Sequence, residues 1–359
     1  MTKLKIGILY GGRSVEHGVS VNSARNIEAF IDRSLYEVCP IGISTTGIWF
    51  LTSSVTKDIE TGSRLKLRLD AENPCFEEEE GDCFLPDIIF PVLHGTDGED
   101  GSIQGLIKAI DIPMVGTGVL GSSLSMNKLV AKQLLAQVGL PVTKYLSLRY
   151  DEERRPSFEE IEAALGLPFM VKAANLGSSV GVSKVKDKRD FLKAIDDSFQ
   201  YDNCILFEEY IQGREIECAI LGNDPPQASL PGEIIIGKQY EFYTFDAKYV
   251  DGNAVKIEVP ASLDQPTAER IRTLSLLAFR HLQCEDFARV DLFLDASGNI
   301  FINEINTIPG FTNSSMYPMM WKERGISFTD LISRLIQMAM QRFQKSKRVQ
   351  KDFKSALKF

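Results

Sequence analysis

Three oxygen-bearing side chains toward the end of the chain, Asp291, Glu304 and Asn306, have the composition of a magnesium site. They lie in two strand-like runs, residues 287–295 and 299–306, which flank a glycine-containing turn and so predict a β-hairpin. Mg²⁺ takes hard oxygen ligands and completes its shell with substrate phosphates. Opposed carboxylates repel each other unless a cation lies between them.

The alternation of side chains along this hairpin gathers the charges on one wall. The register that sets Asp291 opposite Glu304 also sets Arg289 opposite Asn306, and we expect Ile302 on the same face. The alternate residues of the first strand would face a core: Val290, Leu292 and Leu294. A surface cluster of acids neutralised by Arg289 is the alternative, but it accounts poorly for two acids plus an amide. We therefore interpret the wall as a metal site.

A glycine loop upstream suits a phosphate group. Gly177-Ser178-Ser179 offers close backbone approach, N–H groups and hydroxyls, although many hairpin turns look the same. Lys172 strengthens the interpretation, because a lysine in an apolar strand needs an anion or an acidic partner. Lys128, early in its helix, is ambiguous and more often solvated.

Acids also follow the apolar strand that ends at Glu208-Glu209-Tyr210-Ile211. They could accept ribose hydroxyls while the backbone reads an adenine edge. A polar strand end explains them equally well on spacing alone.

The elements that must position these groups begin with a strand at residues 5–10, broken by Gly11-Gly12. Ser20 is placed to cap the helix that follows. The apolar side of this helix would be Ala24, Ile27 and Ile31. A second buried strand at 88–93 ends at His94-Gly95, so an open α/β sheet with site-forming loops at its strand ends is predicted. Residues 53–80 lack a strong period and predict a solvated, variable segment.

Two further units follow. In the first, Ser125 would cap a helix over residues 126–138. The expected strands of that unit are 169–172, a run to Val185, and 205–210. The last unit would hold residues 214–221, a helix over 266–282, the hairpin, and a helix from Phe328 onward.

Composition narrows the class of protein. The net charge of −9 argues against a nucleic-acid or membrane-surface role, since both favour a basic face. Cys39, Cys204 and Cys218 lie in apolar runs and predict buried thiols, and with no signal peptide we expect a cytoplasmic protein. A basic tail is interpreted as a solvated helix end: Arg342, Lys345, Lys347, Arg348, Lys351, Lys354 and Lys358.

Taken in order, these motifs resemble those of the D-alanine–D-alanine ligases of the ATP-grasp superfamily, over nearly the whole chain. The carrying motifs are Gly11-Gly12-Arg13-Ser14-Val15-Glu16-His17, His94-Gly95 with Gly98-Glu99-Asp100-Gly101, residues 172–181, 208–215, Asp246-Ala247-Lys248-Tyr249, and 303–312. The string Asn303-Glu304-Ile305-Asn306-Thr307-Ile308-Pro309-Gly310 is highly specific, whereas the glycine loop alone is not.

The resemblance implies an α/β protein with α+β character in its ATP-binding half: an ATP-grasp fold preceded by a Rossmann-like open-sheet domain. The implied domains are residues 1–116, which bind the first D-alanine, 117–211 with the phosphate loop, 212–345 with the metal site and a lid loop, and a basic tail, 346–359. ATP, D-alanine and two Mg²⁺ ions, with Mn²⁺ as a substitute, are the implied ligands. A homodimer is implied as the assembly.

The family's functional residues carry over to matching positions. Those implied to bind ATP are Lys128, Lys172, Glu208, Glu209, Tyr210, Ile211, Glu215 and Phe293. Asp291, Glu304 and Asn306 would hold the metal ions. Around the first D-alanine would lie Glu16, His94, Arg289 and Gly310, and around the second Ser315 and Met316. Lys248 is a further residue implied to bind substrate. Tyr249, Ser178 and Glu16 would tie the loops together over the closed site.

The implied reaction needs the charge compensation that this wall would supply. A carboxylate attacks the γ-phosphate, so two anions must approach, and Mg²⁺ with lysines offsets their repulsion. The amine of the second D-alanine then attacks the acyl phosphate, and Arg289 with the Gly310 N–H would stabilise the oxyanion. Loops should exclude water from this intermediate.

Departures from the family pattern are Gly18, where an acid is common, Ala173, where proline is common, and Thr244-Phe245 in place of Asp-Tyr. None removes a residue assigned to chemistry. Tyr249 and Met316 favour D-alanine as the second substrate, because relatives that use D-lactate or D-serine differ there.

Three other functions remain open at this point. One is an enzyme of the same superfamily with another amino or hydroxy acid as substrate. A non-catalytic nucleotide-binding regulator is disfavoured, since Asp291 and Glu304 are both present. A dinucleotide-binding module is disfavoured too, because the opening glycines lack the G-x-G-x-x-G spacing.

Overall fold

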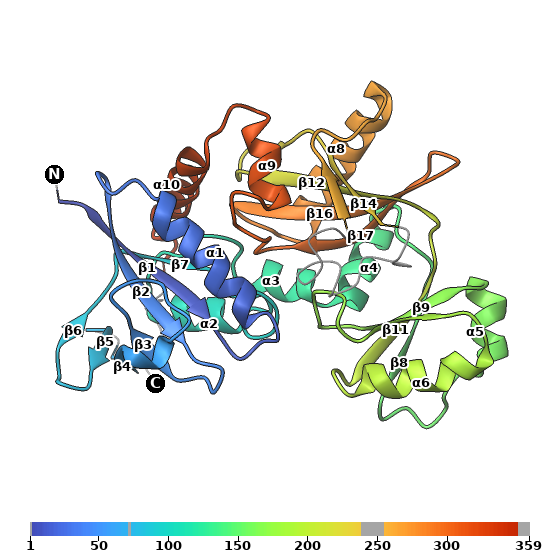
Figure 1. Cartoon of the computed structure of the whole chain (residues 1–359), viewed down its shortest axis with the longest axis horizontal. Helices are drawn as coiled ribbons and strands as arrows, with labels where there is room; N and C mark the ends of the chain where they lie inside the picture. Colours follow the sequence, from blue (N-terminus) through green and yellow to red (C-terminus); the bar gives the residue numbers. More distant parts are fainter. Residues whose placement is uncertain (1, 71–72, 238–254, 351–359) are drawn as a thin grey trace, which may run out of the picture.

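Three β-sheets organise the chain in the computed structural model, which describes residues 2–70, 73–237 and 255–350. Figure 1 shows the N-terminal sheet at one end, the sheet of the final hairpin in the middle, and the four-stranded sheet at the other end with α5 and α6 on its outer side. The predicted α/β organisation in three units is therefore present, although the exact domain boundaries remain predictions.

The N-terminal sheet has seven strands in the order β6-β5-β4-β3-β2-β1-β7. Its strands are β1 (Leu4–Gly11), β2 (Tyr36–Ile43), β3 (Trp49–Leu51), β4 (Ser63–Arg68), β5 (Cys75–Glu78), β6 (Cys83–Phe84) and β7 (Ile88–Pro91). β1 pairs in parallel with β2 and β7, as an open α/β sheet requires, and the remaining pairs are antiparallel.

The prediction of a solvated excursion over residues 53–80 is wrong. β4 and β5 lie in this segment and continue the sheet, with the short helix η1 (Ile59–Thr61) before them. Phe76 is buried and stacks between the rings of Trp49 and Phe84. The strands are short and each buries few apolar residues, so they leave little periodic signal in the sequence.

Helix α1 (His17–Phe30) packs on β1, but Ser20 does not cap it. The N-cap position is Glu16, and Ser20 lies in the first turn, where its hydroxyl accepts from Gly11 N at 2.8 Å and donates to Val92 O at 2.5 Å. Ser20 therefore links the ends of β1 and β7. In the sequence, the preference of serine for helix caps suggested a different role. Helix α2 (Ser102–Ala109) belongs to the same unit.

Helix α10 (Phe328–Ser346) returns to the N-terminal sheet and packs against α1 and β7. The interpretation of Arg342 as part of a solvated basic tail is wrong. Its guanidinium bonds the fully buried Asp286 at 2.8 Å and the carbonyls of Met114 and Gly116. Of the remaining tail, residues 351–359 lie outside the described residues.

The central sheet, which is the second along the chain, has four strands in the order β10-β9-β11-β8. The elements of this central unit are α3 (Val119–Met126), α4 (Lys128–Gln137), β8 (Tyr145–Arg149), α5 (Phe158–Leu165), β9 (Phe169–Ala173), β10 (Val182–Val185), α6 (Lys188–Phe199) and β11 (Cys204–Glu209). Its core joins sheet and helices through Phe158, Phe169, Phe191 and Phe207.

Ser125 does not cap the helix that carries Lys128. It lies buried in α3, with its hydroxyl 3.4 Å from the Cys284 thiol. Asn127 is the cap instead, because its side chain accepts from Val130 N at 3.0 Å. The helix predicted over residues 126–138 is therefore α4, which begins at Lys128, and Ser125 belongs to the separate helix before it.

The last sheet has six strands, with the path β15-β14-β12-β16-β17 and β13 beside β12. Its elements are β12 (Gly213–Leu221), β13 (Gln227–Ala228), β14 (Gly232–Ile236), β15 (Val255–Glu258), α8 (Gln265–His281), β16 (Phe287–Asp295), β17 (Ile300–Asn306) and α9 (Met316–Lys322). Val290, Leu292 and Leu294 face a core under α8, as predicted.

The predicted hairpin and its register are confirmed with one exception. Asp291 pairs with Glu304 and Arg289 with Asn306, but the register shifts next to Asp291, so that Leu292 pairs with Ile302. This β-bulge turns Ile302 into the core, where it is fully buried. The expectation that Ile302 shares the face of Glu304 is therefore wrong.

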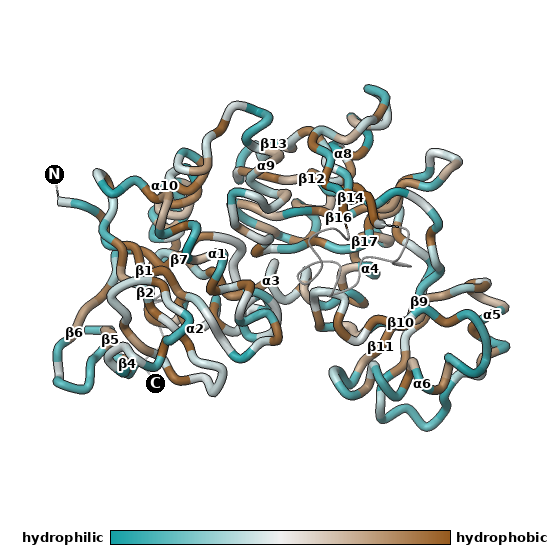
Figure 2. Tube along the Cα trace, in the orientation of Figure 1, coloured by the Kyte–Doolittle hydropathy of each residue, from teal (hydrophilic) through white to brown (hydrophobic). Residues whose placement is uncertain are grey.

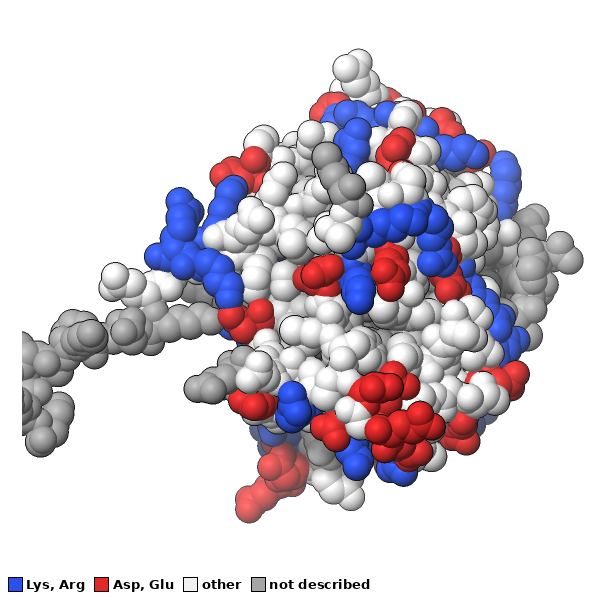
Figure 3. Space-filling view, turned by 90° about the vertical axis from the view of Figure 1, so that its left-hand side faces the viewer, with Lys and Arg blue, Asp and Glu red and all other residues white. Residues whose placement is uncertain are grey.

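Surface properties agree with a globular fold. Figure 2 shows hydrophobic residues concentrated along inner strands such as β1, and hydrophilic ones along the outer loops. On the face in Figure 3, Lys and Arg are interspersed with Asp and Glu. Cys204 and Cys218 are buried, as predicted, and Cys39 is half-buried. None of the described helices is both long and apolar enough to cross a membrane.

Candidate active site

The charged wall of the β16–β17 hairpin is assembled as the alternation predicted. Arg289 donates from Nε and Nη2 to the two oxygens of Asp291, at 2.7 Å each. Asn306 Nδ2 donates to Asp291 Oδ2 at 2.9 Å. Glu217, from the neighbouring strand β12, adds a third carboxylate 3.0 Å from Arg289 Nε, because it pairs with Asp291 across the sheet.

Glu217 was missed from the sequence. The signal was available in the alternation of Glu215 and Glu217 along β12, but no local pattern says that this strand lies beside β16. The bulge supplies a second missed residue. Asn303 is turned toward the site, and its side-chain oxygen accepts from Lys172 Nζ at 3.2 Å.

A buried layer of charge supports Lys172. Its ammonium lies 2.8 Å from Glu208 Oε2, and Lys132 approaches the same oxygen at 3.5 Å while donating to Thr143 Oγ1 at 2.8 Å. Burial alone would raise the pKa of Glu208, but the two lysines lower it to about 2. Lys172 thus has the acidic partner that an apolar strand demands.

The first pocket lies between the central sheet and the last sheet. It is lined by two lysines and two acids of the wall, Lys128, Lys172, Asp291 and Glu304, by the strand-end residues Glu209, Tyr210, Ile211 and Glu215, and by Phe293, Gly177 and Ser179. Nearly all residues predicted to bind ATP therefore share one cavity. Glu208 does not line it, since its carboxylate points back into the lysine layer. The cavity has apolar walls for a ring and cations for phosphates.

The glycine loop covers this pocket from the side of β9 and β10. Ser178 and Ser179 have positive φ angles of 53° and 58°, which expose successive N–H groups. Ser178 Oγ donates to Glu16 Oε1, so the loop is joined to the N-terminal unit as predicted. Lys128 Nζ lies 3.5 Å from Glu304 Oε2, which places this ambiguous lysine at the wall.

A second pocket adjoins the first on the far side of the wall. Its lining holds predicted substrate residues from both ends of the chain: Glu16, His94, Ser178, Arg289, Gly310, Ser315 and Met316. Gly177, Glu217 and Glu304 line both pockets. A group bound in one cavity therefore meets a group bound in the other at Glu304.

The titratable groups of the second pocket are strongly influenced by burial. Burial lowers the pKa of His94, which keeps its imidazole neutral. Burial and the neighbouring Glu16 carboxylate raise the pKa of Glu99 to about 8. The hydrogen bonds that Glu99 accepts from the backbone N–H groups of Gly95 and Ile308 act in the opposite direction and lower the pKa. Ser315 Oγ lies 2.7 Å from Thr312 Oγ1 beside Gly310.

Some predicted residues cannot be placed. Lys248, Tyr249 and the Thr244-Phe245 departure lie outside the described residues, so their roles stay predictions.

The side chains at the wall fit a hard divalent cation. Asp291 and Glu304 line the pocket that also holds Lys128 and Lys172, and Asn306, which donates from Nδ2 to Asp291, lines the second pocket. Among the described residues, no set of three or more His, Cys, Asp or Glu side chains forms a closed metal cage. An open set of this kind suits Mg²⁺, which keeps positions for phosphate oxygens.

Comparison with known proteins agrees with this geometry. Models of the D-ala D-ala ligase N-terminus and C-terminus match residues 5–117 and 134–337. The chain belongs to the D-alanine–D-alanine ligase family. It is 43% identical over 356 residues to D-alanine–D-alanine ligase A of Salmonella typhimurium, covering 95% of this chain and 97% of the relative. The Oceanobacillus iheyensis ligase is 43% identical over 366 residues, covering 97% and 98%.

Solved structures of D-alanine–D-alanine ligase family members have the same fold. The ligase from Coxiella burnetii superposes with a TM-score of 0.84 at 34% identity, covering 96% of this chain and 98% of that chain. The VanG D-Ala:D-Ser ligase from Enterococcus faecalis gives 0.85 at 34% identity, covering 94% and 100%. The predicted ATP-grasp fold and the ligase class are thereby confirmed.

Proposed function

We propose that this chain joins two D-alanine molecules in an ATP-dependent reaction that supplies the dipeptide for peptidoglycan. The observation that carries the proposal is the meeting of the two pockets at the β16–β17 wall. One pocket has the apolar walls and cations that a nucleotide needs, and the other gathers Glu16, Arg289 and Gly310 for a small amino acid. Family membership supports the same reaction.

In the nucleotide pocket, Phe293, Tyr210 and Ile211 would enclose the adenine, and Glu215 would accept from the ribose. Lys128 and Lys172 would bind phosphate oxygens, under the cover of Ser178 and its loop. Glu209 lines the pocket, and its carboxylate accepts from Lys144 N at 2.6 Å. The buried Glu208 would act on ATP through Lys172.

Asp291, Glu304 and Asn306 would hold two Mg²⁺ ions, or Mn²⁺ in their place. Bound there, the ions would offset the negative charge of the phosphates as the substrate carboxylate approaches.

In the second pocket, Glu16 would bind the ammonium of the first D-alanine, while Arg289 and the Gly310 N–H would orient its carboxylate toward the wall. That carboxylate takes the γ-phosphoryl group of ATP and becomes an acyl phosphate. The second D-alanine, with its carboxylate held by Ser315 and its methyl group near Met316, supplies the amine that attacks. Phosphate leaves, and the peptide bond forms as Arg289 and Gly310 stabilise the oxyanion.

The test is phosphate release from ATP with each of D-alanine, L-alanine, D-serine and D-lactate, alone and mixed with D-alanine, followed by mass spectrometry of the products. D-alanine should give the highest rate and D-alanyl-D-alanine as product. Release with L-alanine equal to that with D-alanine would refute the proposal. A preference for mixed D-alanine and D-serine would instead indicate the reaction named for the E. faecalis relative.

The remaining expectations of assembly and location are part of this proposal. We propose a cytoplasmic homodimer with no nucleic-acid or membrane partner, divided as 1–116, 117–211 and 212–345 before the tail. Size-exclusion chromatography with light scattering tests the assembly, since a monomer at micromolar concentration would contradict it.

A further inference from the structure

Three side chains of the N-terminal unit hydrogen-bond to the backbone of the loop that carries Gly310. His94 Nδ1 lies 2.8 Å from Ile308 O, and Glu99 Oε1 accepts from Ile308 N at 2.9 Å. Ser23 Oγ accepts from Phe311 N at 3.3 Å. Because Gly310 lies between Ile308 and Phe311, both sides of its peptide group are held from more than 200 residues away in sequence.

These contacts form one continuous hydrogen-bond chain with a single consistent set of donors. Ile308 O can only accept, so His94 Nδ1 must carry the proton. In a neutral imidazole Nε2 is then an acceptor, and Ser23 Oγ, 3.0 Å away, must donate to it. The Ser23 oxygen keeps a lone pair for Phe311 N. Burial, which keeps the imidazole neutral, is consistent with this arrangement.

Both ring nitrogens of His94 are thus occupied by protein atoms. This differs from the substrate contact that the family resemblance implies for His94. The imidazole is buried at the wall of the second pocket, and both of its ring nitrogens bond protein atoms, so its hydrogen bonds act on the loop.

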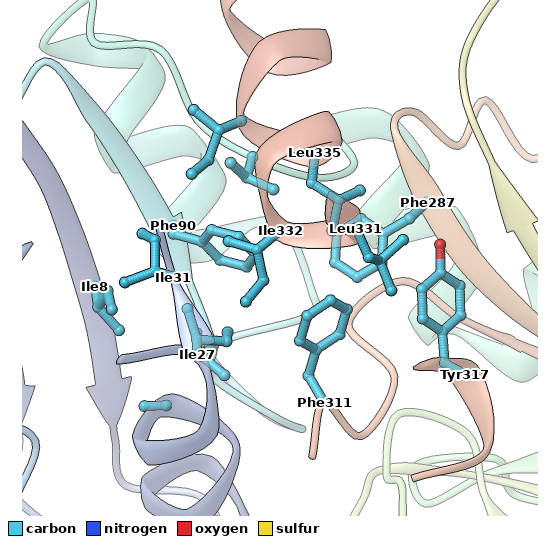
Figure 4. Packing of buried hydrophobic residues seen from close by; sticks show 14 of the residues in the cluster. Ile8, Ile27, Ile31, Phe90, Phe287, Phe311, Tyr317, Leu331, Ile332 and Leu335 are labelled. Atoms are coloured by element: carbon cyan, nitrogen blue, oxygen red, sulfur yellow. The ribbon is translucent and has the colours of Figure 1, made fainter. Parts of the chain in front are cut away.

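Packing anchors the far end of the same loop. Phe311 is buried in the core between the N-terminal sheet and α10, where its ring meets Phe90 at 6.1 Å and Phe328 at 5.2 Å between centroids. Figure 4 shows Phe311 between Phe90 and Tyr317, with Leu331 and Ile332 of α10 above it. The ring alone fixes the position of the loop but leaves its peptide groups free to tilt. The Ser23 and His94 bonds remove that freedom.

We propose that Ser23, acting with His94, is a positioning residue that aims the Gly310 N–H at the reacting carboxylate. The inference rests on the proposed function. Ser23 lies at the wall of the second pocket, and its hydroxyl is engaged with His94 and with Phe311 N, so the role proposed for it is to position the loop. Its side chain is fully buried, and it serves as both donor and acceptor. A misplacement of reacting groups by about 1 Å can cost on the order of 10²-fold in rate.

The test is a steady-state comparison of Ser23→Ala with the matched control Ser275→Ala. Ser275 is also fully buried, but its hydroxyl bonds Ile271 O within its own helix, α8. We expect Ser23→Ala to lower kcat by about 10- to 100-fold with the KM for ATP unchanged, and Ser275→Ala to keep wild-type kcat. Circular dichroism checks that both variants fold.

A double-mutant cycle separates positioning from direct substrate contact. His94→Asn keeps a donor near Ile308 O but loses the acceptor for Ser23. If the two residues act as one chain, the double variant should lose little more activity than the worse single variant. Losses that multiply, or Ser23→Ala with kcat within twofold of wild type, would overturn the inference. Ser23→Cys, which keeps a side-chain donor and acceptor but weakens both bonds, replaces Ser23→Ala if that variant does not fold.

Failure of this inference is distinguishable from failure of the proposed function. If the wild-type chain releases phosphate from ATP in a D-alanine-dependent manner while Ser23→Ala does so equally well, only the role of Ser23 is wrong. If the wild-type chain shows no dependence on D-alanine, the proposed function is wrong, and the positioning role falls with it.

Discussion

Replacing Glu208 by glutamine removes the single negative charge shared by two buried lysines. The carboxylate is fully buried, with Lys172 at 2.8 Å and Lys132 at 3.5 Å. Glutamine keeps the shape of the side chain and leaves the two ammonium groups to repel each other. We expect the central sheet to lose stability and Lys172 to move from its place in the nucleotide pocket.

The size of this effect follows from the pKa of Glu208. The pKa falls from an ordinary 4.5 to about 2 because the lysines outweigh the cost of burial. Each pH unit of such a difference corresponds to about 1.4 kcal/mol, so the ionised carboxylate stabilises the fold by about 3 kcal/mol at neutral pH. Loss of one partner from a buried ion pair typically costs a similar amount, roughly 3–5 kcal/mol.

The pH dependence has a definite sign. Since the pKa of Glu208 is lower in the folded state, its contribution is fully present above pH 4.5 and is lost as the pH falls toward about 2. The deficit of Glu208→Gln relative to wild type should therefore be constant above about pH 5 and shrink below pH 4.5.

Urea unfolding and hydrogen exchange of the β9 and β11 amides measure this deficit between pH 3 and pH 7, and the KM for ATP is a second readout. The control is Glu159→Gln, which removes an exposed partner of Lys188 and should have no measurable effect. A deficit below about 1 kcal/mol at pH 7 would refute the argument, because the buried pair would then contribute no more than a surface one. A deficit unchanged from pH 7 to pH 3 would show that it does not come from the Glu208 charge.

Glu304→Gln should lower turnover by more than about 10²-fold, since even the supporting partners of metal ligands cost 10–100-fold, and wild-type turnover in a folded variant would contradict the metal assignment. Arg342→Leu should destabilise the chain by about 3 kcal/mol, because it leaves the fully buried Asp286 without its cation. An unchanged urea midpoint for Arg342→Leu would contradict this loss of stability. Asn303→Ala should raise the KM for ATP a few-fold with kcat nearly unchanged, because it frees Lys172 from its 3.2 Å contact. Fluorescent-nucleotide titration checks the change in affinity independently.

The two pockets differ in how their walls are held. The nucleotide pocket takes its side chains from β9, β11, β12 and the hairpin, whose spacing is set by sheet hydrogen bonds. The second pocket draws on loops from opposite ends of the chain, and these are joined by Ser178 with Glu16 and by the Ser23–His94 chain. Substrate selection should therefore respond more to substitutions in the loops than nucleotide binding does.

Local patterns in the sequence determined the hairpin and most of its register. Side chains alternate along a strand with a period of two, so Asp291, Glu304, Asn306 and Arg289 had to share a wall once a tight turn joined the strands. Lys172 likewise predicted an acidic partner, because burying an unpaired ammonium group in an apolar strand is costly. The family motifs, especially residues 303–310, added the chemistry to this wall.

Only the tertiary structure decided which distant groups complete the site. A bulge after Asp291 turned Asn303 toward Lys172 and Ile302 into the core, and nothing in the local pattern fixes where a bulge falls. Ser20 and Ser125 were wrong as helix caps because their hydroxyls serve neighbours brought close by folding. A sequence records the type and order of side chains, whereas hydrogen-bond partners are set by strand order and by how the sheets pack.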